Sequence, residues 1–330
     1  MIRILLTFIC AFFIGMIIAP IVIALIKRLK AGQRILSYVE QHKDKEGIPT
    51  MGGIIFLLSA MICCLIFWTG EHHLALIALL ITLSYGIVGG LDDLIKVIFK
   101  RNLGLKAYQK IISQSAIAIL ATIYAYNNAY VGSSIVIPMI NYTLNLKWFY
   151  IPLSFLVYIA TTNCVNLTDG LDGLAGSTSS IFLAVFFVAL YVIYNDAVEM
   201  GQTFYAREIY NLMIFITALV GGIAAFLWFN SHKAKIFMGD TGSLAIGGAC
   251  AVIPLYIKNP LLILIVGVMF VVSGISVILQ VVIFKIKRKR IFLMAPFHHH
   301  LEMKGYNESK IVSFYSLITA VAGVVGLIIM

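Results

Sequence analysis

Long apolar stretches alternate with short polar segments along the whole chain. Stretches of about 20 apolar residues, the length at which an α-helix crosses the hydrocarbon core of a bilayer, recur from one end to the other. The predicted membrane-spanning helices are 4–26, 51–69, 74–91, 111–130, 148–164, 174–194, 209–228, 241–257, 260–284 and 311–329. The first is followed by a basic segment and lacks a small-residue cleavage site, so we interpret it as a retained span rather than a signal peptide. The pattern predicts an all-α, polytopic membrane protein with about ten transmembrane helices and a single integral domain over residues 1–330.

Composition and charge agree with this prediction. The chain is 61% hydrophobic and only 12% charged, whereas a soluble domain is about a quarter charged, which excludes a soluble protein. If the N-terminus lies outside, the inner segments are 27–50, 92–110, 165–173, 229–240 and 285–310. Of the 24 Lys and Arg residues, those that fall outside these segments are only Arg3, Lys147, Arg207 and Lys258. The positive-inside rule then predicts that both termini are outside. The net charge of +10 therefore suits anionic lipid and phosphates at the cytoplasmic face rather than nucleic acid.

Two other features carry no predicted chemistry. The five cysteines lie in apolar stretches without the spacing of metal ligands, which argues against a disulfide framework and a zinc site; they are Cys10, Cys63, Cys64, Cys164 and Cys250. The outer segment 131–147 alternates polar and apolar residues around Pro138 and Asn141. We expect a short hairpin there.

Five of the seven aspartates lie where predicted spans meet inner segments: Asp92, Asp93, Asp169, Asp172 and Asp240. Carboxylates at a membrane edge are costly, so their default interpretation is a functional site. They belong to three separate segments, and helix packing can bring them to one depth. Beside many basic residues, such carboxylates suit a hard divalent cation such as Mg²⁺ and a substrate that carries phosphate.

The local spacing of these residues adds detail. Asp92 and Asp93 are adjacent in GGLDDLIK, and adjacent helical residues diverge by about 100°, so we expect separate roles for the two. Asn166, Asp169 and Asp172 follow one another at intervals of three in NLTDGLDG. This spacing places polar groups along one helix face, and the interleaved glycines allow close approach of a phosphate or another helix.

Each acidic motif also has a structural alternative. Asp92 and Asp93 could form a solvated helix end beside Lys96. The NLTDGLDG segment could be an ordinary glycine-rich turn. Asp240, in FMGDTGS, could be the N-cap of the apolar helix that follows it. The occurrence of all five aspartates on one face of the membrane favours the functional interpretation.

Two further inner segments contain polar and aromatic residues. Three consecutive histidines, His298, His299 and His300, cannot all point one way on a helix, which disfavours a three-histidine zinc site. Imidazoles can instead donate hydrogen bonds to phosphate or move protons near neutral pH, and a plain polar interfacial loop is the alternative. Asn230 and Phe237 offer an amide and an aromatic face, which suit a planar base; a membrane-anchoring role for Phe237 is equally compatible.

Several of these segments together resemble one enzyme family. The segments are PTMGG (49–53), GGLDDLIK (89–96), NCVNLTDGLDGLAGS (163–177), FNSHKAKIFMGDTGSLAIGG (229–248) and APFHHHLE (295–302). They closely resemble the phospho-N-acetylmuramoyl-pentapeptide-transferase family, and the similarity covers essentially the whole chain. The paired aspartates, NLTDGLDG and MGDTGS also resemble the wider polyprenyl-phosphate N-acetylhexosamine-1-phosphate transferase superfamily, whereas PFHHHLE is typical of the muramoyl-pentapeptide branch.

The resemblance implies an activity and a setting. It implies a Mg²⁺-dependent enzyme that moves phospho-MurNAc-pentapeptide from UDP-MurNAc-pentapeptide to undecaprenyl phosphate, giving lipid I and UMP in the first membrane step of peptidoglycan synthesis. It also implies a homodimer in the bacterial plasma membrane, with the active site facing the cytoplasm.

The resemblance also assigns roles to residues. By the resemblance, Asp240 is expected to bind Mg²⁺. We expect Asp92 to act on the lipid phosphate and Asp93 to support substrate or metal, with the choice between these two for the lipid phosphate left open, so all three are candidate catalytic and metal residues. The substrate-binding residues that it implies are Asn166, Asp169 and Asp172 for the diphosphate and metal environment, Asn230 and Phe237 for uracil, and Lys110, His299 and His300 for phosphates or sugar. Direct attack by the lipid phosphate and a two-step route through an aspartyl-phosphate both remain open.

Two rival functions follow from the same residues. A sister transferase that uses UDP-GlcNAc would share the chemistry, and the PFHHHLE segment argues against it. A proton-coupled secondary transporter would also place acids in the membrane. Transporters bind near the midplane and often contain inverted repeats, whereas the acids here lie at one edge and the chain shows no convincing repeat.

Overall fold

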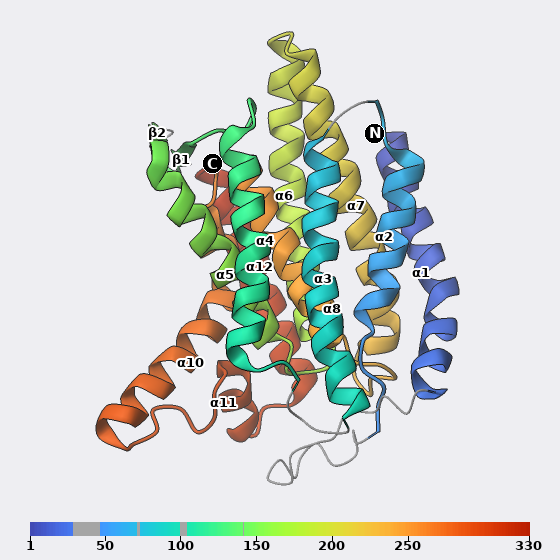
Figure 1. The fold of residues 1–330 in the computed structure, drawn as a ribbon, viewed down its shortest axis with the longest axis vertical. Coiled ribbons are helices and arrows are strands. Elements are labelled where there is room, and N and C mark those ends of the chain that lie inside the picture. Colours follow the sequence, from blue (N-terminus) through green and yellow to red (C-terminus); the bar gives the residue numbers. More distant parts are fainter. Residues whose placement is uncertain (29–46, 71–72, 100–103, 141) are drawn as a thin grey trace.

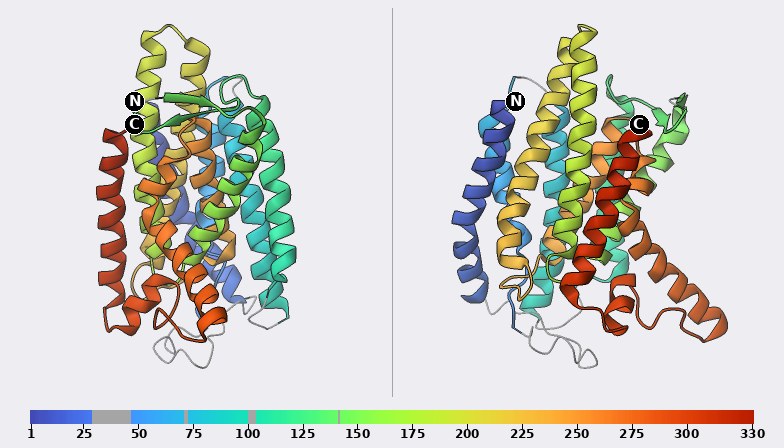
Figure 2. Two further views of the ribbon diagram at one scale, coloured as in Figure 1. Left: turned by 90° about the vertical axis from the view of Figure 1, so that its left-hand side faces the viewer. Right: turned by 180° about the vertical axis from the view of Figure 1, so that it is seen from behind.

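The computed structural model describes residues 1–28, 47–70, 73–99, 104–140 and 142–330. Asp44 and most of the predicted inner segment 27–50 lie outside these ranges. The helices are α1 Ile2–Arg28, α2 Gly53–Phe67, α3 Leu74–Ile98, α4 Ala107–Asn127, α5 Tyr150–Thr168, α6 Leu174–Glu199, α7 Thr203–Asn230, α8 Gly239–Tyr256, α9 Leu262–Val266, α10 Val268–Lys287, α11 Phe297–Met303 and α12 Glu308–Ile328. They form a bundle with both termini at the same end (Figures 1 and 2).

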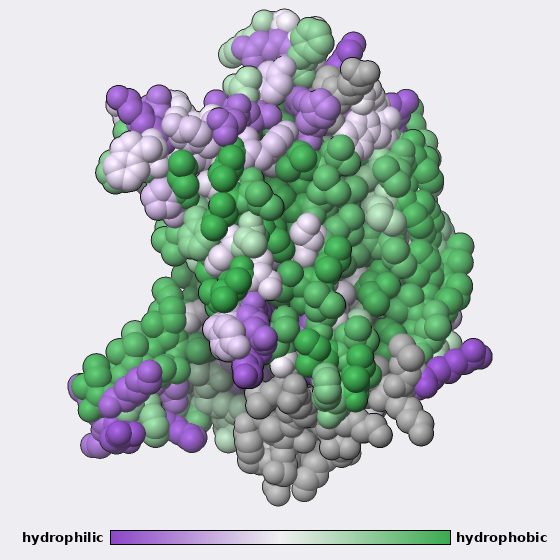
Figure 3. Space-filling view, in the orientation of Figure 1, coloured by the Kyte–Doolittle hydropathy of each residue, from purple (hydrophilic) through white to green (hydrophobic). Residues whose placement is uncertain are grey.

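The described helices confirm an all-α membrane protein. Seven are long and apolar enough to cross a bilayer: α1, α3, α5 with the 3-10 turn before it, α6, α7, α10 and α12. Figure 3 shows apolar side chains covering the middle of the visible face, as contact with lipid requires. The other three predicted spans correspond to α2, α4 and α8. The number of spans that cross the membrane, and the assignment of the two termini to the outside, stay predictions.

Helix α8 differs from the other helices because protein surrounds it. Every residue from Thr241 to Tyr256 is buried, and α8 packs against α3, α5 and α2. A helix that faces no lipid needs no bulky apolar outer surface, which is compatible with the glycines in this segment. It starts at the end of the bundle opposite the termini (Figure 1).

The predicted span 260–284 is wrong as a single helix. The chain breaks at Gly267 into the short helix α9 and the longer helix α10. The N–H of Gly267 bonds to the carbonyl of Ile263, and the N–H of Phe270 bonds back to the carbonyl of Gly267, so a turn separates the two helices. As a result α10 leans away from the bundle (Figures 1 and 2), with apolar side chains such as Ile278 and Ile286 exposed.

The hairpin predicted within 131–147 is confirmed, and its position outside the membrane stays a prediction. Strands β1 Ser134–Ile137 and β2 Tyr142–Asn145 pair antiparallel, with Ser134 opposite Asn145. The N–H of Val136 donates to the carbonyl of Lys258, and the N–H of Met139 donates to the carbonyl of Ile329. The hairpin thereby joins the ends of two helical regions that are distant in sequence.

Close backbone contacts fix the position of α8. A Cβ atom on Gly89 of α3 would overlap the carbonyl oxygen of Asp240, and one on Gly53 of α2 would overlap the Cα of Gly242. Only glycine permits helix backbones to approach this closely. These two contacts set the first turn of α8 directly against α3 and against the start of α2.

We predict that Gly89→Ala destabilises the protein while Gly90→Ala does not. The added methyl group at Gly89 collides with backbone of α8, and overpacking of this kind costs about 1–3 kcal/mol. At Gly90 the same methyl group would lie 3.6 Å from the Thr241 hydroxyl oxygen, an ordinary contact. Thermal unfolding of the two purified variants in detergent measures the difference. Equal melting temperatures would show that the α3–α8 contact is less close than described here.

Candidate active site

Three carboxylates meet where α3 ends and α8 begins. Asp92 and Asp93 lie near the end of α3, and Asp240 lies in the first turn of α8. Each offers an oxygen, and these oxygens lie within 4.8 Å of one another. Asp92 is 3% exposed and Asp93 is 2% exposed, which rejects the alternative of a solvated helix end. Buried carboxylates repel unless cations lie beside them.

Two lysines supply positive charge at this cluster. The Nζ of Lys96 lies 2.6 Å from Asp92, 2.8 Å from Asp240 and 3.6 Å from Asp93. The Nζ of Lys110, from α4, lies 3.0 Å from Asp240. Lys96 reaches Asp92 and Asp93 because residues four and three apart share one side of a helix. Two ammonium groups against three carboxylates leave the cluster with a formal negative charge, and its oxygen donors are those that a hard divalent cation prefers.

Asp93 caps the N-terminus of α8. Its carboxylate accepts hydrogen bonds from the N–H of Asp240 at 3.2 Å, and from the N–H and hydroxyl of Thr241 at 2.9 and 2.8 Å. The N-cap position of α8 is Met238, which makes no side-chain cap. The alternative that Asp240 caps its own helix is therefore wrong, because a carboxylate from another helix does so. The Asp240 carboxylate instead contacts the ammonium group of Lys96.

Two further groups fix the other carboxylates. The amide of Asn166, in the last turn of α5, donates to Asp240 at 2.7 Å and to the hydroxyl of Ser243 at 2.8 Å. The N–H of Leu105 donates to Asp92 at 2.8 Å. Four segments of the chain thus converge on this cluster. They are α3, α5, α8 and the stretch that leads into the first turn of α4.

The segment after α5 does not continue the helix. Helix α5 ends at Thr168 and Gly173 has φ +77°, so the expectation that Asn166, Asp169 and Asp172 share one helix face is wrong. The glycines favour a turn here because they tolerate positive φ. Asp169 is half-buried in this turn. Its burial, and then the negative charges of Asp240, Asp93 and Asp172, raise the pKa of the Asp169 carboxyl.

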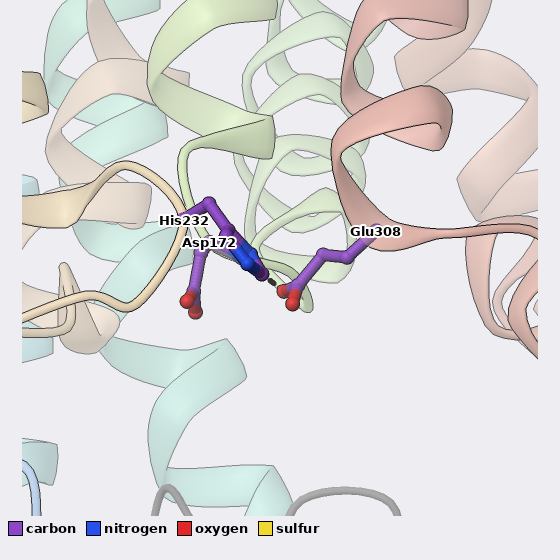
Figure 4. A group of neighbouring side chains, drawn as sticks. All are labelled: Asp172, His232 and Glu308. Atoms are coloured by element: carbon purple, nitrogen blue, oxygen red, sulfur yellow. Dashed lines mark hydrogen bonds between the residues drawn. The ribbon is translucent and has the colours of Figure 1, made fainter.

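Asp172 lies in a second group with His232 and Glu308 (Figure 4). The N–H of Asp172 donates to the Glu308 carboxylate at 2.7 Å, and its own carboxylate accepts from the N–H of Ala234 at 3.1 Å. These bonds tie the turn after α5 to the 231–238 segment and to the first turn of α12. The structure therefore divides the five aspartates rather than gathering all of them at one point.

The predicted base-binding residues adjoin the start of α8. Asn230 is buried, its amide oxygen accepts from the N–H of Gly173 at 3.0 Å, and its amide nitrogen donates to the carbonyl of Ile236 at 2.9 Å. Both the oxygen and the nitrogen of the Asn230 amide are therefore hydrogen-bonded to backbone groups. Phe237 is half-buried, and its backbone bonds to Pro49 and Gly52. Asn230 is placed to position the segment that carries Phe237, and contact of either residue with uracil stays a prediction.

The three histidines lie on α11 and have different surroundings. His298 is buried against the turn after α5, where a Cβ on Gly170 would overlap its Nε2. Its burial, and then the charge of His299, lower the pKa of His298 well below the usual range, so this imidazole is neutral. His299 bonds to Glu302 at 2.9 Å, and His300 Nδ1 accepts from the N–H of Leu293 at 3.1 Å. His300 thus holds its own loop, and contact of His299 or His300 with phosphate or sugar stays a prediction.

The structure brings three further residues to these two groups, and the sequence predicts a role for none of them. They are Lys96, His232 and Glu308. The sequence pattern places Lys96 beside the paired aspartates without a role, although its spacing from Asp92 is a usable signal. His232 lies within the 229–248 segment but no role is predicted for it, and Glu308 lies in no motif and 136 positions from its partner Asp172. Only tertiary structure brings those two together.

Comparison with known proteins gives two family matches and many relatives. Residues 75–258 match the model of glycosyl transferase family 4, and residues 45–57 match phospho-N-acetylmuramoyl-pentapeptide-transferase signature 1. The first match spans more than half of the chain and contains Asp92, Asp93 and Asp240.

Several curated proteins named phospho-N-acetylmuramoyl-pentapeptide-transferase are similar over nearly the whole chain. The protein of Clostridium novyi (strain NT) is 42% identical over 317 residues, which cover 96% of this chain and 93% of that relative. That of Clostridium kluyveri (strain ATCC 8527) is 44% identical over 317 residues and covers 96% of both chains. That of Clostridium perfringens (strain SM101) is 44% identical over 320 residues, 97% of this chain and 94% of the relative. With the buried carboxylate cluster and the two family matches, this similarity shows that the chain belongs to the phospho-N-acetylmuramoyl-pentapeptide-transferase family.

Proposed function

We propose that this protein transfers phospho-MurNAc-pentapeptide from UDP-MurNAc-pentapeptide to undecaprenyl phosphate, with release of UMP and formation of lipid I. The observation that carries the proposal is the buried group of three carboxylates and two lysines at one end of an apolar helical bundle. Both substrates are polyanions, and one has a lipid tail that a membrane-embedded enzyme can receive from the bilayer. The names of the relatives support the choice of these substrates.

The carboxylate cluster fits Mg²⁺ by its donor atoms, which are oxygens from three different carboxylates. Asp240 and Asp92 would hold the ion, and Asp93 would support it while capping α8. When bound, Mg²⁺ would neutralise charge on the diphosphate and on the departing UMP. The site would face the cytoplasm of a bacterial cell, since it is built at the ends of helices that adjoin the predicted inner segments, where lysine and arginine are concentrated.

The lipid phosphate is the attacking group. At neutral pH it has lost most of its second proton, because the second pKa of a phosphate monoester is near 6. An oxygen of this phosphate forms a new bond to the phosphorus attached to the sugar, while the bond from that phosphorus to the UMP oxygen breaks. Alignment therefore matters more than a strong base. Lys110 would draw the phosphates together, and Asp92 would orient the lipid phosphate.

The contacts of Asp93 favour direct attack over a route through a phosphorylated Asp93. Both oxygens of Asp93 accept hydrogen bonds from the start of α8, and phosphorylation of either oxygen would disrupt the cap. Among the described residues, the Asp92 carboxylate contacts Leu105, Lys96 and Asp240 and caps no helix, so of the adjacent pair it is the residue better placed to act on substrate.

The residues around the cluster would bind the rest of the nucleotide sugar. Asn166, Asp169 and Asp172 would organise the diphosphate side, Phe237 would stack on uracil, and Asn230 would hold the Phe237 segment in place. His299 and His300 would lie near the sugar on α11. We also carry forward from the family resemblance that the protein is a homodimer.

The proposed function predicts which nucleotide sugar the protein accepts. Purified protein with Mg²⁺ and undecaprenyl phosphate should release UMP from UDP-MurNAc-pentapeptide and not from UDP-GlcNAc. Chromatographic detection of UMP measures both reactions, and a chelator should abolish the first. Release from UDP-GlcNAc alone would support the sister transferase, while release from neither, by a well-folded sample, would contradict the proposed function.

The second prediction tests the carboxylates. Asp92→Asn, Asp93→Asn and Asp240→Asn should each lower UMP release by more than about 100-fold, the scale of losing one electrostatic contact in a transition state. Asp196→Asn is a matched control, because Asp196 is exposed near the far end of α6. Comparable activity in all four variants, each extracted from membranes at wild-type yield, would remove this cluster from the mechanism.

The third prediction concerns Phe237. Stacking of a base on an aromatic ring contributes about 1–3 kcal/mol, so Phe237→Ala should raise the KM for the nucleotide sugar about tenfold. Phe237→Tyr retains the ring and should stay near the wild-type value. Inhibition by UMP should weaken in parallel with KM, because UMP carries the same base. A KM that is the same in the alanine and tyrosine variants would place uracil elsewhere.

A further inference from the structure

Lys96 occupies the space that the three carboxylates enclose. Its ammonium group lies 2.6 Å from Asp92 and 2.8 Å from Asp240, and it reaches Asp93 at 3.6 Å. Lys110 contacts only Asp240 among the three. Lys96 is thus the one described cation that contacts all three carboxylates at once.

The oxygens that Lys96 contacts are the same oxygens that would hold a divalent cation. They lie within 4.8 Å of one another, so a metal ion and an ammonium group could not both lie among them. Two positive charges a few ångströms apart would also repel strongly in a site of low dielectric constant. Occupation by one cation therefore requires departure of the other.

Lys96 has room to depart. Its side chain is 32% exposed, whereas those of Asp92 and Asp93 are 4% and 2% exposed. The carboxylates keep other partners when it leaves, because Asn166 and Lys110 still bond to Asp240. The α8 amides still bond to Asp93. The lysine can move toward the open side of the site while the carboxylates stay in place.

We infer that Lys96 is an internal counter-ion that competes with the divalent cation for these carboxylates and is released toward the substrate diphosphate when the cation binds. The inference rests on the proposed function. In the metal-free protein Lys96 offsets the repulsion among three buried carboxylates. In the metal-bound protein the same ammonium group becomes available to the polyanionic substrate, so metal binding prepares the site for phosphate.

Binding of Mn²⁺ alone tests the competition. Electron paramagnetic resonance of free Mn²⁺ should show that Lys96→Met, in detergent without substrate, binds Mn²⁺ about tenfold more tightly than wild type, a typical size for coupling between two ligands. UMP release should nevertheless fall, because the substrate loses its lysine. Lys106→Met is the matched control, since Lys106 is an exposed lysine at the start of α4 that touches none of the carboxylates. It should bind Mn²⁺ as wild type does.

The outcomes separate this inference from the proposed function. If Asp240→Asn binds Mn²⁺ as wild type does, the metal site itself is wrong and both ideas fail. If Asp240→Asn loses Mn²⁺ while Lys96→Met binds it with unchanged or weaker affinity, the metal site stands and only the competition is overturned. Lys96→Gln serves as a second variant with a polar side chain, in case the methionine variant fails to fold.

A measurement on the unmodified protein supplies an independent test. Reductive methylation of lysines, followed by peptide mass spectrometry, should label Lys96 several-fold faster after Mg²⁺ is added, because its amine is no longer held between carboxylates. Lys106 is the internal control and should label at the same rate with and without Mg²⁺. Labelling of Lys96 that Mg²⁺ slows or leaves unchanged would contradict release of the lysine.

Discussion

Asp93 accepts hydrogen bonds from the first amide groups of α8, and this contact between two helices sets the geometry around it. Helix α8 is enclosed by protein from Thr241 onward, so its free N–H groups at the start need partners from the protein. The positive end of the helix dipole also favours a carboxylate at this position. Because Gly89 lets the two backbones touch, the same contact brings Asp240 opposite Asp92. The active site is therefore a consequence of how the central helix is capped.

The cost of this arrangement is electrostatic. Three carboxylates are held close together, two of them almost fully buried, and burial of charge is unfavourable unless the groups are paired and hydrogen-bonded. Here each carboxylate has at least two partners: Asp92 has Leu105 and Lys96, and Asp240 has Asn166 with both lysines. Apolar packing of the surrounding helices supplies the stability that such a cluster cannot. The carboxylates outnumber the lysines beside them, and one of those lysines is partly exposed. The cluster is therefore well suited to a divalent cation that takes the place of Lys96.

Sequence patterns predicted the architecture better than the details of the site. Hydrophobic runs report their length directly, so they predicted the long helices, and the alternation of polar and apolar residues predicted the hairpin. The acidic motifs pointed to five aspartates, of which Asp92, Asp93 and Asp240 lie together in the structure. The break at Gly267, the end of α5 before Asp169 and the capping of α8 by Asp93 were not predicted. Each depends on contacts between residues that are far apart in the chain or on a local glycine conformation. Hydrophobic periodicity gives no information on distant contacts or on glycine conformation. For the same reason it did not predict the pairing of Asp172 with Glu308.

The two groups of aspartates lie in parts of the structure that are held together by different kinds of contact. The carboxylate cluster and Asn166 lie on α3, α5 and α8, and the backbone of α8 is in close contact with both α3 and α5. The surrounding residues lie on the turn after α5, on the 231–238 segment and on α11, which are joined by side-chain bonds such as those of Asn230 and Glu308 and by the burial of His298 against Gly170. Under the proposed function, changes in these connecting segments would alter which nucleotide sugar fits without moving the carboxylates. The proposed function thus accounts for acidic motifs that resemble a whole superfamily and a histidine segment that is typical of one branch, because it assigns chemistry and substrate choice to different structural elements.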